Sequence, residues 1–156
     1  MTGNPLTLMT IELDIQIATD FESIPSAEQF GLWAGLALKD HTGAELTLRL
    51  VDREESSQLN GQYRGKDGPT NVLSFAAELP PGIDLPLLGD IVICAPLVAE
   101  EARLQGKPPE SHWAHLVVHG VLHLLGHDHQ TGEEAVKMES LEVELLNSIG
   151  IANPYL

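Results

Sequence analysis

Apolar and polar residues alternate along two segments of the N-terminal half, Leu6–Ala18 and Glu45–Asp52. A period of two predicts strands that bury one face. Two further apolar segments, Asn71–Ala77 and Gly89–Ala95, are separated by a loop rich in Pro and Gly and also read as strands. The pattern therefore predicts a sheet of about four strands.

Helical spacing of apolar residues or helix-boundary signals mark five more segments. Ser26 is a suitable N-cap for the first of them, and a glycine stops each of the three C-terminal ones. The predicted helices are Ala27–Lys39, Arg53–Tyr63, Leu97–Gln105, Glu110–Leu125 and Glu133–Ser148. Strands first and helices last predict one α+β domain over residues 1–156, with one mixed sheet and about five helices packed on it.

The composition removes several classes of protein. Cys94 is the single cysteine, so a disulfide framework is impossible. No apolar run reaches the roughly 18 to 20 residues of a membrane span, and the N-terminal segment lacks the pattern of a secretory signal. These observations predict a cytoplasmic protein. The net charge of −15 argues against a broad basic surface for nucleic acid but leaves a local site open.

Six of the seven histidines lie between residues 112 and 129. Four of them, His112, His115, His119 and His123, form one stripe along a predicted helix whose other faces are apolar. A helix that is apolar on almost all sides is buried, so this polar stripe needs partners inside the protein.

His119 and His123 lie one helical turn apart, which lets two imidazoles converge on one cation. Gly126 ends the helix and allows the chain to turn so that His129 points back to the same cation. This H-x3-H-x2-G-x2-H spacing is that of the metzincin peptidases. It predicts a site for one metal ion at the end of a buried helix, with Zn²⁺ favoured and nickel, copper or iron also compatible.

One position departs from the peptidase pattern. Those enzymes place a glutamate, the general base, directly after the first histidine, where this chain has Gly120. A metal with three histidines still lowers the pKa of a bound water to about 7, so hydrolysis stays feasible. Two interpretations of these residues stay open beside a different metal-dependent hydrolase: a metzincin-like metallopeptidase without its usual base, and a noncatalytic metal-binding module. A purely structural zinc usually has four protein ligands, which counts against the second alternative.

The sequence gives less specific expectations for the other residues considered as part of a site. Three histidines complete a mononuclear site, so His112 and His115 are expected to be solvated or to support a ligand. Asp128 fits a loop residue as well as a group that orients a ligand histidine. Cys94 and Met138 are expected to be core residues.

Several separate motifs occur together with the histidine string. They are the segment Tyr63–Phe75 (YRGKDGPTNVLSF), the segment Leu88–Ile91 (LGDI), and a last helix with Met138, Glu142, Leu145 and Leu146 that precedes Pro154 and Tyr155. In this order they resemble the YbeY family of metal-dependent endoribonucleases, over about residues 45–156.

The resemblance implies a zinc-binding fold and hydrolysis of single-stranded RNA in ribosomal RNA maturation, notably at the small-subunit 3′ end, and in ribosome quality control. Single-stranded or ribosomal RNA and the ribosome or its associated proteins would be the partners, and a noncatalytic ribosome-binding module is the alternative to an enzyme here. By motif position, His119, His123 and His129 would hold the metal and Arg64 would be the catalytic basic residue. A guanidinium suits the charge that grows on phosphate oxygens. From the residues alone, a solvated turn explains Arg64 equally well.

Overall fold

The computed structural model describes residues 11–39, 41, 43–83, 85–128 and 130–156. Within them, one sheet contains β1 (Glu12–Ala18), β2 (Glu45–Val51), β3 (Val72–Ala76) and β4 (Leu87–Cys94). The strand order is β1-β2-β4-β3, in which β1, β2 and β4 run parallel and β3 is an antiparallel edge strand. In β2 the alternation places Leu46, Leu48 and Leu50 on the buried face, as predicted.

The described residues also contain five helices, each at a predicted place. They are α2 (Ala27–Ala37), α3 (Arg53–Arg64), α4 (Ala95–Gln105), α5 (Pro109–Leu124) and α6 (Gly132–Asn147). Capping boxes begin α2 at Ser26 and α6 at Thr131, because each side chain accepts a hydrogen bond from a backbone N–H of the first turn. No helix in the described part of the chain has the length and apolar character that crossing a membrane requires.

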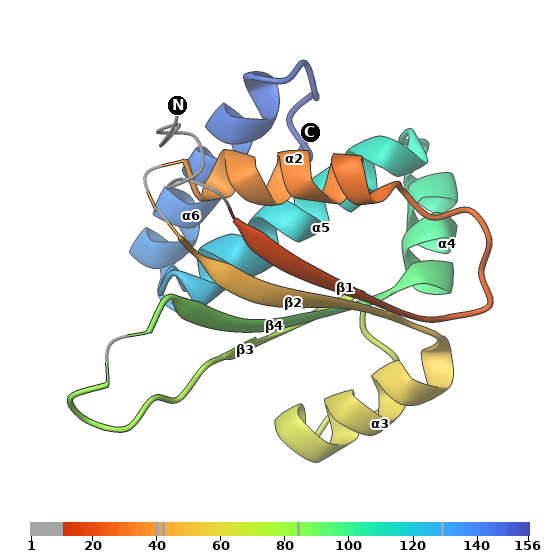
Figure 1. The fold of residues 1–156 in the computed structure, drawn as a ribbon. Coiled ribbons are helices and arrows are strands. Elements are labelled where there is room, and N and C mark those ends of the chain that lie inside the picture. The colour runs from red at the N-terminus through yellow and green to blue at the C-terminus, as the bar shows by residue number, and fades with distance from the viewer. Residues whose placement is uncertain (1–10, 40, 42, 84, 129) are drawn as a thin grey trace, which may run out of the picture.

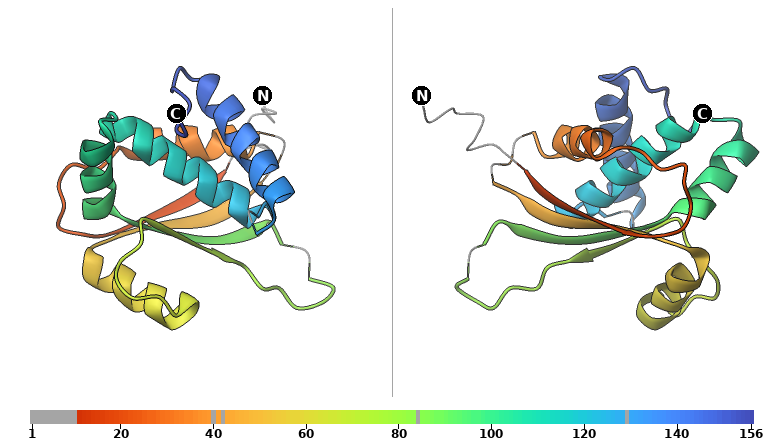
Figure 2. Two further views of the ribbon diagram at one scale, coloured as in Figure 1. Left: turned by 180° about the vertical axis from the view of Figure 1, so that it is seen from behind. Right: turned by 45° about the vertical axis from the view of Figure 1, so that its right-hand side comes forward.

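The helices lie on both faces of the sheet but unequally. Figure 1 and Figure 2 show α2, α4, α5 and α6 on one side and α3 alone on the other. The larger core lies between the sheet and α2 and α5, where the rings of Phe30, Trp33 and Trp113 meet edge to face. A smaller apolar cluster lies under α3 and includes the buried thiol of Cys94.

The predicted fold class is confirmed: an α+β structure with one mixed four-stranded sheet and, in the described residues, five helices. The first part of the strand predicted at Leu6–Ala18 lies outside the described residues. The other predicted boundaries agree with the structure to within a few residues. The fold therefore places α5, with its histidines, between the sheet and the outer helices.

Candidate active site

The histidine stripe predicted for α5 is present in the structure. Ten residues of α5 are buried, because this helix packs against α2, the sheet and α6. Successive rings of His112, His115, His119 and His123 lie 6.5, 6.2 and 5.4 Å apart between centroids. One end of the stripe, at His112, is deeply buried, while His119 and His123 near the other end are only half-buried.

A cavity of about 460 Å³ lies over the C-terminal half of α5. Its lining includes Arg64 from the end of α3, Ser74 from β3, His119 and His123 from α5, and Asp128 from the following loop. Tertiary structure thus brings Arg64 together with two of the three predicted metal ligands. The third predicted ligand, His129, lies outside the described residues.

Arg64 is exposed and is the one permanently charged cation among the described residues that line this cavity. No ion pair to Arg64 is found in the described part of the chain. The next residue, Gly65, has φ +65° and ends α3, so the chain turns away directly after Arg64. The guanidinium is therefore available to an anionic ligand in the cavity.

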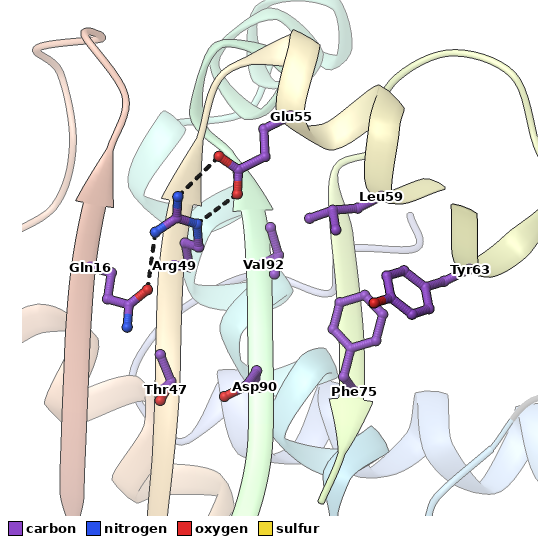
Figure 3. Close-up of a pocket in the computed structure, with 9 residues that line it drawn as sticks. All are labelled: Gln16, Thr47, Arg49, Glu55, Leu59, Tyr63, Phe75, Asp90 and Val92. Carbon is purple, nitrogen blue, oxygen red and sulfur yellow. Dashed lines mark hydrogen bonds and ion pairs between the residues drawn. The ribbon is translucent and has the colours of Figure 1, made fainter. Parts of the chain in front are cut away.

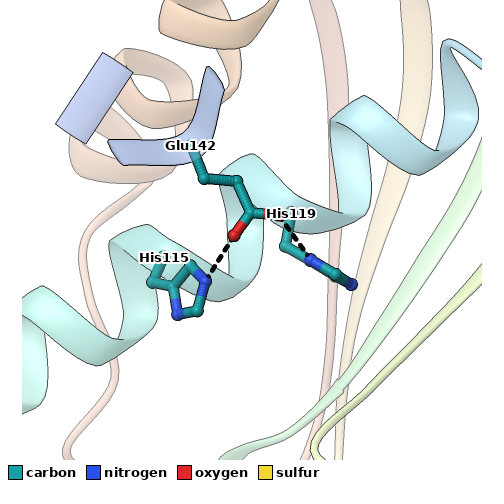
Figure 4. Close-up of side chains that lie close together, drawn as sticks. All are labelled: His115, His119 and Glu142. Carbon is teal, nitrogen blue, oxygen red and sulfur yellow. Dashed lines mark hydrogen bonds and ion pairs between the residues drawn. The ribbon is translucent and has the colours of Figure 1, made fainter. Parts of the chain in front are cut away.

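Glu142 on α6 is the group that contacts two of the histidines (Figure 4). Its side chain is fully buried, with Oε2 2.8 Å from Nδ1 of His119 and Oε1 2.7 Å from Nε2 of His115. The hydroxyl of Tyr155, beyond α6, also donates to Oε1. The sequence carried a signal for this burial: Glu142 lies on the same helical face as Met138 and Leu145, which are buried.

The electrostatic state of this cluster follows from its contacts. Burial alone would raise the pKa of Glu142, but hydrogen bonds from His115, His119 and Tyr155 outweigh it and hold the pKa at about 2. Burial and the neighbouring carboxylate raise the pKa of Tyr155, so its hydroxyl stays a donor. Because an ionised carboxylate only accepts, the Nδ1 atom of His119 carries the shared hydrogen.

His115, His119 and Glu142 could hold a metal ion, since one ligand atom from each lies within 4.8 Å of the others. Imidazole nitrogens and carboxylate oxygens are ligands that zinc and other divalent transition metals accept. This set shares His119 with the predicted set. The other described member of the predicted set, His123, lines the cavity beside His119, with ring centroids 5.4 Å apart and planes inclined by 71°.

Gly120, the residue in place of the peptidase glutamate, packs directly against the sheet. A Cβ atom at this position would lie 3.0 Å from Cγ2 and 3.1 Å from Cδ1 of Ile91, a fully buried residue of β4. A side chain at position 120 would therefore require Ile91 to change its rotamer or α5 to move away from the sheet. This close packing is a physical reason for a glycine, and not a glutamate, at position 120.

The structure contradicts the expectation that His112 is solvated. It is buried, not solvated, and its Nε2 atom lies 2.8 Å from Oε1 of Glu101 on α4. Asn71 donates to the same oxygen, so α4 and the loop before β3 meet at this carboxylate. His112 thus helps fix α5 against α4. Met138 and Cys94 are buried, as predicted.

A second cavity, of about 440 Å³, lies on the other face of the sheet beneath α3 (Figure 3). There Arg49 is held by Glu55, with nitrogen–oxygen distances of 2.6 and 3.0 Å, and by Gln16 at 3.0 Å. Tyr63 and Phe75 line both cavities, and their ring centroids are 5.0 Å apart. The two aromatic rings therefore separate the histidine cavity from the groove under α3.

Comparison with known proteins agrees with this geometry. A family model described as endoribonuclease YbeY matches residues 15–150. Among solved structures, the chain is similar to TM1509 from Thermotoga maritima, known from a solution structure, with 28% sequence identity and a TM-score of 0.56 over 86% of this chain and 91% of that chain. The family match begins within β1 and includes the other three strands, Arg64, the histidine stripe and α6. The chain therefore belongs to the endoribonuclease YbeY family, which supports metal-dependent RNA cleavage in ribosomal RNA processing as its general activity.

Proposed function

We propose that this protein is a zinc-dependent, single-strand-specific endoribonuclease of the cytoplasm. In this proposal it acts in maturation of the small-subunit ribosomal RNA 3′ end and in ribosome quality control, with the ribosome or its associated proteins as partners. The whole chain, residues 1–156, works as one metallo-hydrolase domain. The observation that supports the proposal best is the cavity in which Arg64 meets His119 and His123.

His119, His123 and His129 would hold one Zn²⁺ ion. When bound, zinc supplies a Lewis acid that lowers the pKa of water and polarises a phosphoryl oxygen. Arg64 would bind the nonbridging oxygens through its planar fork of N–H donors and stabilise the negative charge that grows during attack. Asp128 lines the same cavity and would accept or relay a proton there.

The charge of the protein constrains how RNA is held. With a net charge of −15, the surface as a whole repels a polyanion, so affinity has to come from contacts inside the cavity. Tyr63 and Phe75 line the cavity beside Arg64, and aromatic rings stack with unpaired bases. A base in a duplex has both faces covered by its neighbours. This contrast supports single-stranded RNA as the substrate.

The experiment compares the zinc-loaded protein on three substrates: a fluorescent single-stranded RNA, the same RNA in a duplex, and a labelled peptide mixture. The variants are Arg64→Ala and His123→Ala, with Arg103→Ala as a matched control because Arg103 is an exposed arginine on α4 away from the cavity. Element analysis measures the zinc content of each protein.

We expect cleavage of the single strand alone. Loss of one charge-stabilising donor costs about 10² to 10³ in rate, so Arg64→Ala should fall by this factor with unchanged zinc content. His123→Ala should lose zinc and activity, and Arg103→Ala should match the wild type. Peptide cleavage without RNA cleavage would reverse the proposal in favour of a metallopeptidase. Unaltered RNA cleavage by Arg64→Ala would remove the role given to Arg64.

A further inference from the structure

Glu142 is the one fully buried carboxylate in the described residues, and it accepts hydrogen bonds from three side chains. Two of the donors, His115 and His119, belong to α5, and the third, Tyr155, follows α6 near the C-terminus. A buried carboxylate is costly unless donors compensate for its lost hydration. Glu142 lies on the buried face of α6 among apolar residues. Its burial therefore indicates a role at the two histidines that it contacts.

The distances from Glu142 to the two histidines are those of hydrogen bonds. A tetrahedral zinc ion with bonds of about 2.1 Å holds its donor atoms about 3.4 Å apart. The oxygens of Glu142 lie 2.7 Å from Nε2 of His115 and 2.8 Å from Nδ1 of His119, which are the distances of charge-assisted hydrogen bonds. In this arrangement Glu142 accepts a hydrogen bond from each ring, which is the contact expected of a carboxylate that supports a ligand histidine.

The contact with His119 also determines which nitrogen of that ring can bind a metal. A neutral imidazole carries hydrogen on one nitrogen and a lone pair on the other. With the Nδ1 hydrogen directed at Glu142, the lone pair lies on Nε2 of His119. His119 lines the cavity together with His123. Nε2 would therefore be the atom of His119 that binds a metal in this cavity.

We propose that Glu142 is a positioning residue for the metal centre: it fixes the tautomer and orientation of His119 so that Nε2 is the metal-binding atom, and Tyr155 holds Glu142 in this position. The proposal rests on the proposed function only in taking His119 as a metal ligand. Carboxylates that orient ligand histidines in this way raise metal affinity by about 10- to 100-fold.

The role of Tyr155 makes the C-terminal segment part of the metal centre. Tyr155 donates its hydroxyl to Oε1 of Glu142, and its ring packs edge to face on His115 with centroids 5.3 Å apart. The adjacent carbonyl of Pro154 accepts a hydrogen bond from Lys107, which lies between α4 and α5. The segment is thus attached at two neighbouring residues, and Tyr155 restrains Oε1 of Glu142 while His119 contacts Oε2.

The test measures zinc affinity by competition with a chromophoric chelator, in the full-length chain. The variants are Glu142→Gln and Tyr155→Phe, and Glu144→Gln is the matched control because Glu144 is an exposed glutamate of the same helix. Glutamine offers one acceptor oxygen where His115, His119 and Tyr155 need two. Its amide group can also donate to Nδ1 of His119, which would move the ring hydrogen to Nε2 and block metal binding.

We expect Glu142→Gln to bind zinc about 10- to 100-fold more weakly, Tyr155→Phe to bind it a few-fold more weakly, and Glu144→Gln to match the wild type. Nitrogen-15 spectra of the wild-type histidines give a second readout that needs no variant to fold. They should show zinc on Nε2 of His119 and a retained, slowly exchanging hydrogen on Nδ1.

Three results would overturn the proposal. One is an unchanged zinc affinity in folded Glu142→Gln, and another is zinc on Nδ1 of His119 in the wild type. The third is loss of zinc in His115→Ala with retention in His123→Ala, which would make Glu142 a ligand itself. These readouts are independent of RNA cleavage: a weakened Glu142→Gln in a protein that cleaves no RNA would refute the proposed function and leave this inference standing.

Discussion

Gly120 of α5 packs so closely against Ile91 of β4 that a side chain at position 120 should lower the stability of the fold. A methyl group at position 120 would lie 3.0 to 3.3 Å from three side-chain atoms of Ile91, which is fully buried on β4. Such distances are shorter than ordinary carbon contacts, which are optimal at about 3.5 to 4.0 Å. Gly120→Ala therefore forces α5 and the sheet apart or moves Ile91 from its rotamer.

Two opposing contributions determine the size of the effect. Replacing a glycine inside a helix with alanine stabilises it by about 1 kcal/mol, while overpacking a core costs about 1 to 3 kcal/mol. We expect Gly120→Ala to lower the free energy of unfolding by about 0 to 2 kcal/mol, the difference between these two terms. Gly31→Ala in α2 isolates the first contribution, because a Cβ at Gly31 would have no atom within 4 Å.

The assay is urea denaturation followed by circular dichroism, on a double-mutant cycle with Ile91→Ala. Ile91→Ala alone should cost about 2 to 5 kcal/mol through the cavity that it leaves. In that background all three contacting atoms are gone, so Gly120→Ala should become stabilising by about 1 kcal/mol or more. Full stabilisation by Gly120→Ala in the wild-type background, equal to that of Gly31→Ala, would refute the steric argument.

Two further predictions concern stability. Gly89 has φ +141°, and a Cβ at this position would lie 2.1 Å from the carbonyl oxygen of Phe75. Gly89→Ala should therefore destabilise the protein by about 3 kcal/mol or more in thermal denaturation. A loss below about 1 kcal/mol, which is typical of a surface substitution, would contradict this prediction. The hydrogen bond from Arg49 lowers the pKa of Glu55 below its ordinary value of 4.5, so this pair stabilises the fold above that pH and the stabilisation is lost as the pH falls below it. Glu55→Gln should therefore be less stable than the wild type at pH 7, with a difference that narrows in urea titrations below pH 4.5, and a pH-independent difference would exclude this cause.

The local pattern of the sequence determined the elements and their order. Alternation in β2, the N-cap at Ser26 and the apolar faces of α5 are nearest-neighbour properties, and each was confirmed. The helical period also placed His119 and His123 on one stripe. These predictions succeed because a period of 2 or 3.6 residues follows from backbone geometry alone.

Tertiary structure decided the strand order and the partners of the histidines. The parallel pairing of β2 with β4 places β3 at the edge, and this brings the end of α3, with Arg64, to the cavity over α5. Apart from the family resemblance of the segment Tyr63–Phe75, the residues near Arg64 fit a solvated turn equally well. Its position depends on contacts between segments more than 50 residues apart.

Glu142 and Gly120 show the same limit from two sides. The sequence shows that one position lacks a glutamate and that another has one on an apolar face. The close contact between α5 and Ile91 explains the glycine at position 120. The packing of α6 on His115 and His119 explains the glutamate at position 142. Local periodicity fixes which face of a helix is buried, but only the packing of helices and sheet determines what that face contacts, because those contacts join residues far apart in the chain.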